Sequence, residues 1–108
     1  MVKGTQAELL SAIVTRLAEA FKPEEIYLFG SRARGTERVG SDFDFLVILG
    51  DMNEPGYRYS QRAHQILWGL RKSADIFFMT REQFEGSKKV IGTLPEVVWR
   101  EGKSLYAA

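Results

Sequence analysis

The spacing of hydrophobic residues divides the chain into helical and extended segments. Between residues 6 and 21, apolar side chains recur every three or four positions, which predicts an amphipathic helix with one buried face. Residues 26–29 and 43–49 are short apolar runs rich in aromatic and β-branched residues, and such runs are typical of strands. A similar run at 74–79 predicts a third strand.

The remaining segments predict further helices. After a glycine- and proline-containing loop at 50–56, apolar residues within 63–70 again follow a helical spacing. Thr80 and Gln83 match a capping box, which predicts a short helix after the third strand. Pro95 and Gly102 bracket a helix over about 94–100. Residues 105–106 fit either a short edge strand or simple packing onto the core.

These elements predict a mixed α/β, or α+β, fold: a small mixed sheet with helices between its strands. We expect the helices to pack on one face of this sheet and to leave the other face for a site. The chain has 108 residues, of which 44% are hydrophobic and 27% charged, so one domain spanning residues 1–108 is expected.

Composition and charge exclude several classes of protein. There is no cysteine, which rules out disulfides, thiolate zinc sites and cysteine nucleophiles. No apolar run approaches the ~20 residues of a membrane-spanning helix. The net charge of +1 argues against general binding of polyanions, so no direct contact with nucleic acid is expected. The first residues lack the features of a secretory signal, and a cytoplasmic protein is therefore expected.

Three aspartates are the candidate metal ligands. Asp42 and Asp44 stand two positions apart at the start of a predicted strand, so their carboxylates project to the same face. Like charges this close are costly, and a divalent cation would relieve the repulsion. Asp75 opens the third strand and can join them if that strand lies beside the second. Three carboxylates suit two Mg²⁺ ions, or Mn²⁺ in their place, for nucleotidyl transfer.

A glycine-containing turn precedes this acidic pair. Gly30 and Ser31 stop the first strand abruptly, and such a turn exposes backbone N–H groups that can bind phosphate. Glycine allows phosphate a close approach to the backbone. Arg32 and Arg34 follow directly and are candidate phosphate contacts, although a solvated loop explains them equally well.

Other residues have less specific interpretations. His64 is the only histidine and fits a surface or packing role better than a catalytic one. Trp68 and Trp99 are expected in the core or at an interface rather than as platforms for a base. Tyr57 and Tyr59 could line a nucleotide cleft, but ordinary packing explains them as well.

The motif itself resembles the signature of the DNA polymerase β-like nucleotidyltransferases, and within them the minimal nucleotidyltransferases. The matching residues are Gly30, Ser31, Ala33, Gly35, Ser41, Asp42 and Asp44. The order of elements, the later Asp75 and the closing segment 100–106 extend the resemblance over nearly the whole chain. Phe43 and Phe45 depart from the smaller aliphatic residues of many relatives, which concerns packing rather than ligands.

The resemblance implies a polymerase β palm-like fold and a set of roles. Gly30 and Ser31 would bind the β- and γ-phosphates, and Asp42 and Asp44 would bridge two Mg²⁺ ions. Asp75 would bind the catalytic metal and orient or deprotonate the acceptor hydroxyl. Relatives of this size often act as antitoxins whose partner is an all-helical HEPN ribonuclease toxin. Some transfer AMP from ATP to a tyrosine of that toxin, which implies a type VII-like toxin–antitoxin pair here.

Two alternatives differ from this hypothesis in kind. The chain could neutralise the toxin by binding alone, with the nucleotide site regulatory or unused. It could instead modify a small molecule such as an aminoglycoside, although such enzymes usually carry an added helical domain for the acceptor. The nucleotide preference and the formation of a homo-oligomer stay open at this point.

Overall fold

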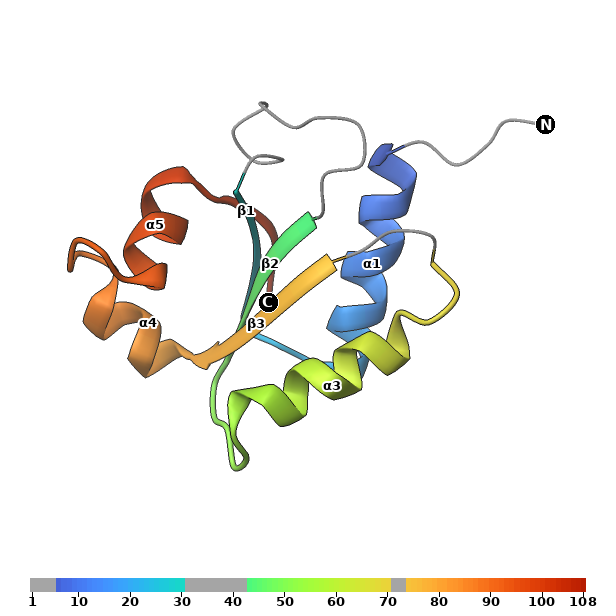
Figure 1. Ribbon diagram of the computed structural model, residues 1–108, viewed down its shortest axis with the longest axis horizontal. Helices are drawn as coiled ribbons and strands as arrows, with labels where there is room; N and C mark the ends of the chain where they lie inside the picture. The colour runs from blue at the N-terminus through green and yellow to red at the C-terminus, as the bar shows by residue number, and fades with distance from the viewer. Residues whose placement is uncertain (1–5, 31–42, 71–73) are drawn as a thin grey trace.

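The computed structural model describes residues 6–30, 43–70 and 74–108. Four helices and four strands lie within these ranges (Figure 1). In chain order they are α1 (Gln6–Phe21), β1 (Glu25–Phe29), β2 (Phe43–Leu49), α3 (Gly56–Ile66), β3 (Ala74–Thr80), α4 (Arg81–Ser87), α5 (Leu94–Glu101) and β4 (Lys103–Ala107). The mixed α/β class expected from the sequence is confirmed.

The strands form one mixed sheet in the order β3-β2-β1-β4. β1 runs antiparallel to both β2 and β4, whereas β2 and β3 run parallel. A parallel pair needs a crossover connection, and α3 lies within the one between β2 and β3. Residues 105–106, for which the sequence allowed two interpretations, lie in the edge strand β4.

One face of the sheet packs against α1 and α3. Alternate residues of β2, among them Phe43, Phe45 and Val47, point to this side and are buried. Ile13 and Leu17 of α1 meet them and are buried as well. Phe43 and Phe45 thus serve packing on the face opposite Asp44.

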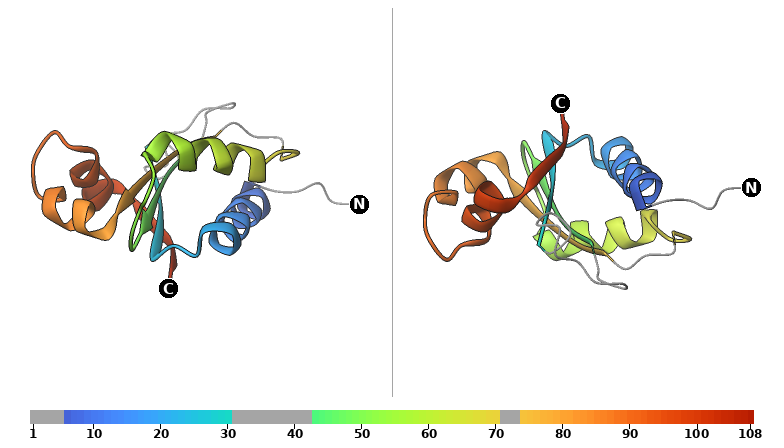
Figure 2. Two further views of the ribbon diagram at one scale, coloured as in Figure 1. Left: turned by 90° about the horizontal axis from the view of Figure 1, so that it is seen from below. Right: turned by 90° about the horizontal axis from the view of Figure 1, so that it is seen from above.

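The other face is also covered in part, so the expectation of helices on one face only was wrong. α4 and α5 lie on this second face (Figure 2). Their residues Phe84 and Val98 are fully buried against Tyr27, Leu46 and Ile48. The physical reason lies in the strands: β1 and β2 are apolar at nearly every position, and a strand apolar on both sides needs cover on both sides. None of the described helices is long and apolar enough to cross a membrane.

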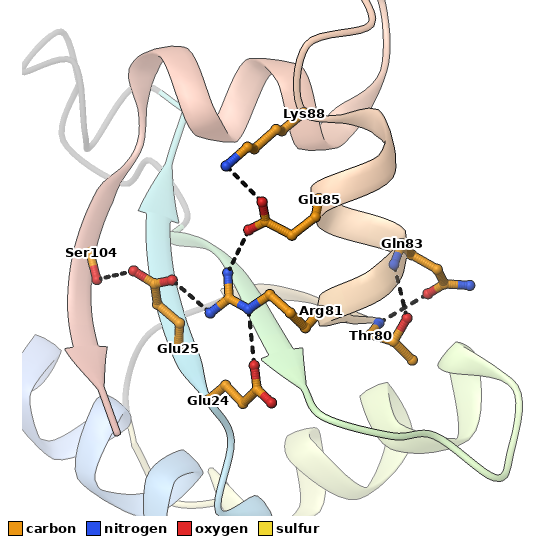
Figure 3. A network of polar contacts seen from close by, with 8 residues as sticks. All are labelled: Glu24, Glu25, Thr80, Arg81, Gln83, Glu85, Lys88 and Ser104. Atoms are coloured by element: carbon orange, nitrogen blue, oxygen red, sulfur yellow. Dashed lines mark hydrogen bonds and ion pairs between the residues drawn. The ribbon is translucent and has the colours of Figure 1, made fainter.

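Local chemistry and an ionic network place α4. The Thr80 side chain accepts from the Gln83 backbone while the Gln83 side chain accepts from the Thr80 backbone, which confirms the predicted capping box. Arg81 then donates from Nε to Glu24 Oε1 at 2.9 Å and from Nη2 to Glu25 Oε1 at 3.0 Å (Figure 3). The guanidinium thus joins the start of α4 to the start of β1.

Candidate active site

At Gly30, the turn after β1 comes close to the side chain of Asp44 on β2. Gly30 has a positive φ of 78°, a conformation that other residues rarely adopt. A Cβ atom at Gly30 would lie 2.5 Å from Oδ2 of Asp44, well inside van der Waals contact. The predicted phosphate turn therefore begins directly against one of the predicted metal ligands.

Asp44 and Asp75 are direct register partners. β2 and β3 are neighbours, and their parallel pairing sets Asp44 opposite Asp75. Residues paired in this way project to the same face of a sheet. Phe29 at the end of β1 pairs with Asp44 from the other side. The end of β1 and the starts of β2 and β3 therefore meet at one end of the sheet.

The remaining predicted site residues are Ser31, Arg32, Arg34 and Asp42, and they lie outside the described residues. The ligand roles of Asp44 and Asp75 therefore stay predictions. Among the residues that the structure describes, no group of three acidic or histidine side chains could hold a metal ion. The two carboxylates that are placed offer oxygen donors only, and such a donor set suits a hard cation such as Mg²⁺.

The two placed carboxylates at this end of the sheet are not buried. Asp75 is exposed and Asp44 is partly exposed, although both lie on the face that α4 and α5 cover further along. Along β3, Asp75 and Phe77 are exposed while their neighbours Ala74, Ile76 and Phe78 are buried toward α1 and α3. The helices on this face thus leave its carboxylate end open.

Sequence reasoning did not single out Phe77. Phe77 is 43% exposed, and its ring centroid lies 6.0 Å from that of Phe29. The strand period could have found it, because a residue two positions after Asp75 must share the face of that carboxylate. An exposed aromatic ring next to two acidic side chains is the unusual feature of this site.

The other residues considered from the sequence lie elsewhere. His64 is exposed on α3, consistent with a surface role. Tyr59 is buried in the core of the opposite face, where its hydroxyl donates to Asn53, so it does not border the carboxylates. Trp68 is 86% exposed and is not a core residue, whereas Trp99 packs edge-on against Phe84.

Solved structures share this fold. A Sulfolobus solfataricus protein assigned as a nucleotidyltransferase is 25% identical, with a TM-score of 0.64 over 99% of this chain and 92% of that one. A toxin–antitoxin structure with AMP-PNP gives 24% identity and a TM-score of 0.63, covering 91% of this chain and 73% of its own. A mutant form of the MntA-HpeT toxin–antitoxin gives 24% and 0.62, covering 92% and 72%. The last two likenesses establish the fold alone.

The mixed sheet and its helices place the chain in the fold class of the solved Sulfolobus solfataricus nucleotidyltransferase structure. The sequence pattern of the nucleotidyltransferase domain family matches residues 10–98, and the chain belongs to that family. The matched range includes Gly30, Asp44 and Asp75. A search of curated proteins found no significant match.

Proposed function

We propose that this chain is a Mg²⁺-dependent adenylyltransferase that transfers AMP from ATP to a tyrosine hydroxyl of a cognate HEPN toxin. The observation that carries the proposal is the register pair of Asp44 and Asp75 on the open part of the sheet, in a chain of the nucleotidyltransferase family. The structural relative with AMP-PNP supports an adenine nucleotide, and the MntA-HpeT relative supports a toxin partner. The antitoxin would then act on its partner in the cytoplasm.

The reaction is an in-line displacement. The acceptor oxygen bonds to the α-phosphorus, the bond from that phosphorus to the bridging oxygen breaks, and pyrophosphate leaves with its electron pair. Asp75 orients the acceptor hydroxyl and takes its proton, while backbone N–H groups at Gly30 and Ser31 hold the leaving phosphates. Arg32 and Arg34 are further phosphate contacts in this proposal.

Mg²⁺ held by Asp42, Asp44 and Asp75 would supply positive charge where negative charge develops in the transition state. The close approach of Gly30 to Asp44 supports this division of roles, because it brings the phosphate turn against the metal ligand. A bulkier residue at position 30 would separate the two.

Intact-protein mass spectrometry tests the proposal. The purified chain is incubated with Mg²⁺, each of the four NTPs in turn and the protein encoded next to it. We expect the partner to gain the mass of AMP with ATP, and peptide mapping to place it on a tyrosine. Asp44→Asn should abolish the gain, whereas Asp51→Asn, the same change just past the far end of β2, should not.

The other outcomes separate the alternatives. If the partner is neutralised at a one-to-one ratio without any mass gain, the proposed AMP transfer is contradicted. That result would favour an antitoxin that acts by binding. A parallel incubation with an aminoglycoside tests the small-molecule reaction, which would leave the partner protein unmodified.

A further inference from the structure

Phe77 is exposed at a position where the sheet could have buried it. On β3 the same face carries Asp75, then Phe77, then Met79, and Met79 is partly buried against the core beneath α4 and α5. Phe77 is 43% exposed, and its ring lies beside the buried ring of Phe29. The ring therefore forms part of the open surface that also holds the carboxylates.

Strand geometry fixes how far this ring lies from the acidic pair. Two residues along a strand advance about 6.6 Å, so Phe77 is one side chain further along the same face than Asp75. Its register partner is Leu46, whereas the partner of Asp75 is Asp44. β3 is the outermost strand on this side of the sheet, and from it the ring of Phe77 reaches across β2 to a centroid distance of 6.0 Å from the Phe29 ring on β1.

The order of the strands then decides which substrate Phe77 meets. This step rests on the proposed function, in which the leaving phosphates are held at Gly30, at the end of β1. In-line attack requires the acceptor oxygen to approach opposite the leaving group. Since β2 lies between β1 and β3, the acceptor comes in over β3, where Asp75 and Phe77 are exposed.

We propose that Phe77 contacts the acceptor and selects a hydroxyl that is carried on an aromatic ring. Aromatic pairs with centroids about 4.5–7 Å apart are favourable beyond the apolar area they bury. The 6.0 Å spacing of Phe29 and Phe77 provides a small aromatic surface beside the carboxylates. A phenol can lie against this surface while its oxygen reaches Asp75, whereas an alkyl hydroxyl offers no ring to hold.

Steady-state kinetics with two small acceptors test this assignment. The full chain is given Mg²⁺, ATP and either N-acetyltyrosinamide or N-acetylserinamide, and AMP transfer is measured. The wild type should modify the tyrosine probe only. Phe77→Ala should raise the KM for the tyrosine probe about tenfold while the KM for ATP stays the same. Phe77→Tyr should keep the KM for the tyrosine probe near the wild-type value. Phe77→Leu, which keeps apolar bulk without a ring, should give a KM between those of the wild type and Phe77→Ala.

Ile91→Ala is the matched control, because Ile91 is 90% exposed in the connection between α4 and α5, outside the sheet that carries Asp44 and Asp75. It should leave both KM values unchanged. A rise in the KM for ATP alone would mean that Phe77 contacts the nucleotide base, and would overturn the assignment. Unchanged kinetics in Phe77→Ala, or equal transfer to both probes, would overturn it while leaving the proposed function in place. A wild type that transfers AMP to no probe and no partner protein would overturn both.

Discussion

The two ends of the sheet differ in the charged group that faces their acidic side chains. At the start of β1, Glu24 and Glu25 both accept hydrogen bonds from the guanidinium of Arg81 (Figure 3). At the other end, the register sets Asp44 opposite another carboxylate, Asp75. The first arrangement joins elements of the fold. The second opposes like charges, which destabilises a sheet unless something else requires it.

The difference separates acids that hold the fold together from the pair for which we propose a catalytic role. At the Arg81 end, partial burial lowers the pKa of the guanidinium, but its hydrogen bonds to Glu24 and Glu25 raise that pKa by more, so the network favours the charged form. At the Asp44 end, the register of β2 and β3 sets two acids opposite each other. Rules of local consistency tend to fail at functional sites, and this end of the sheet breaks one.

The largest expected effect concerns Asp75. Asp75→Asn should lower AMP transfer more than about 100-fold, since even residues that only support a metal ligand cost about 10–100-fold. In metal-free buffer the same change should raise the free energy of unfolding by roughly a few tenths of a kcal/mol, because a like-charge pair is removed. Transfer assays and urea unfolding in EDTA measure the two effects. Loss of stability without metal would show that Asp75 has a structural role instead.

Gly30→Ala should be next. The added Cβ would meet Asp44 Oδ2, and the positive φ would be strained, so we expect a loss of about 2–3 kcal/mol in unfolding free energy together with reduced transfer. Gly92→Ala is the control, because Gly92 has a φ of 94° but nothing within 4 Å of an added Cβ. It should cost only about 1 kcal/mol and leave transfer unchanged. If urea unfolding gives the same loss of unfolding free energy for Gly30→Ala and Gly92→Ala, the close approach to Asp44 does not destabilise Gly30→Ala.

Arg81→Gln tests the structural end of the sheet. It should lower the free energy of unfolding by about 1–2 kcal/mol, a figure reduced for solvent screening because the side chain is partly exposed. Arg100→Gln is the control, because Arg100 contacts Glu96 and Glu101 within its own helix, and the loss of such exposed pairs should cost much less. AMP transfer should be unchanged in both variants. A loss of transfer in Arg81→Gln would show that the two ends are coupled.

The smallest effect is a pH dependence of stability. A hydrogen bond from Lys88 lowers the pKa of Glu85, and one from Arg100 lowers the pKa of Glu96. Because the folded pKa values lie below the ordinary value of 4.5, the unfolded chain binds more protons in acid, and stability should fall as pH drops through the folded pKa values.

Thermal unfolding from about pH 7 to about pH 3 measures this dependence. Replacing Glu85 and Glu96 by glutamine should flatten the curve. A wild type that gains stability in acid would contradict a stabilising role for the ion pairs of Glu85 and Glu96.

Much of the fold could be predicted from local pattern. The helix over residues 6–21 and the strand over 43–49 were predicted with the bounds that the structure has. The cap at Thr80 was predicted because its two partners lie three residues apart. The helices on the second face were not predicted. Leu46 and Ile48 indicated them, because a strand that is apolar on both sides needs packing against both faces of its sheet.

The candidate site was predictable only in part. The sequence indicated that Asp44 and Asp75 each begin a strand, but their meeting depended on which strands pair. Phe77 went unnoticed because an aromatic residue within an apolar run looks like core. Only the partial cover by α4 and α5 leaves its ring exposed.

By itself, the sequence determined the elements, their caps and the side on which each strand carries its acids, since these depend on neighbours within about four residues. Tertiary structure alone decided that β2 lies between β1 and β3, that Asp44 pairs with Asp75, and that β4 closes the other edge. The reason is physical: strand register is set by packing of the buried faces, which brings together residues about thirty positions apart.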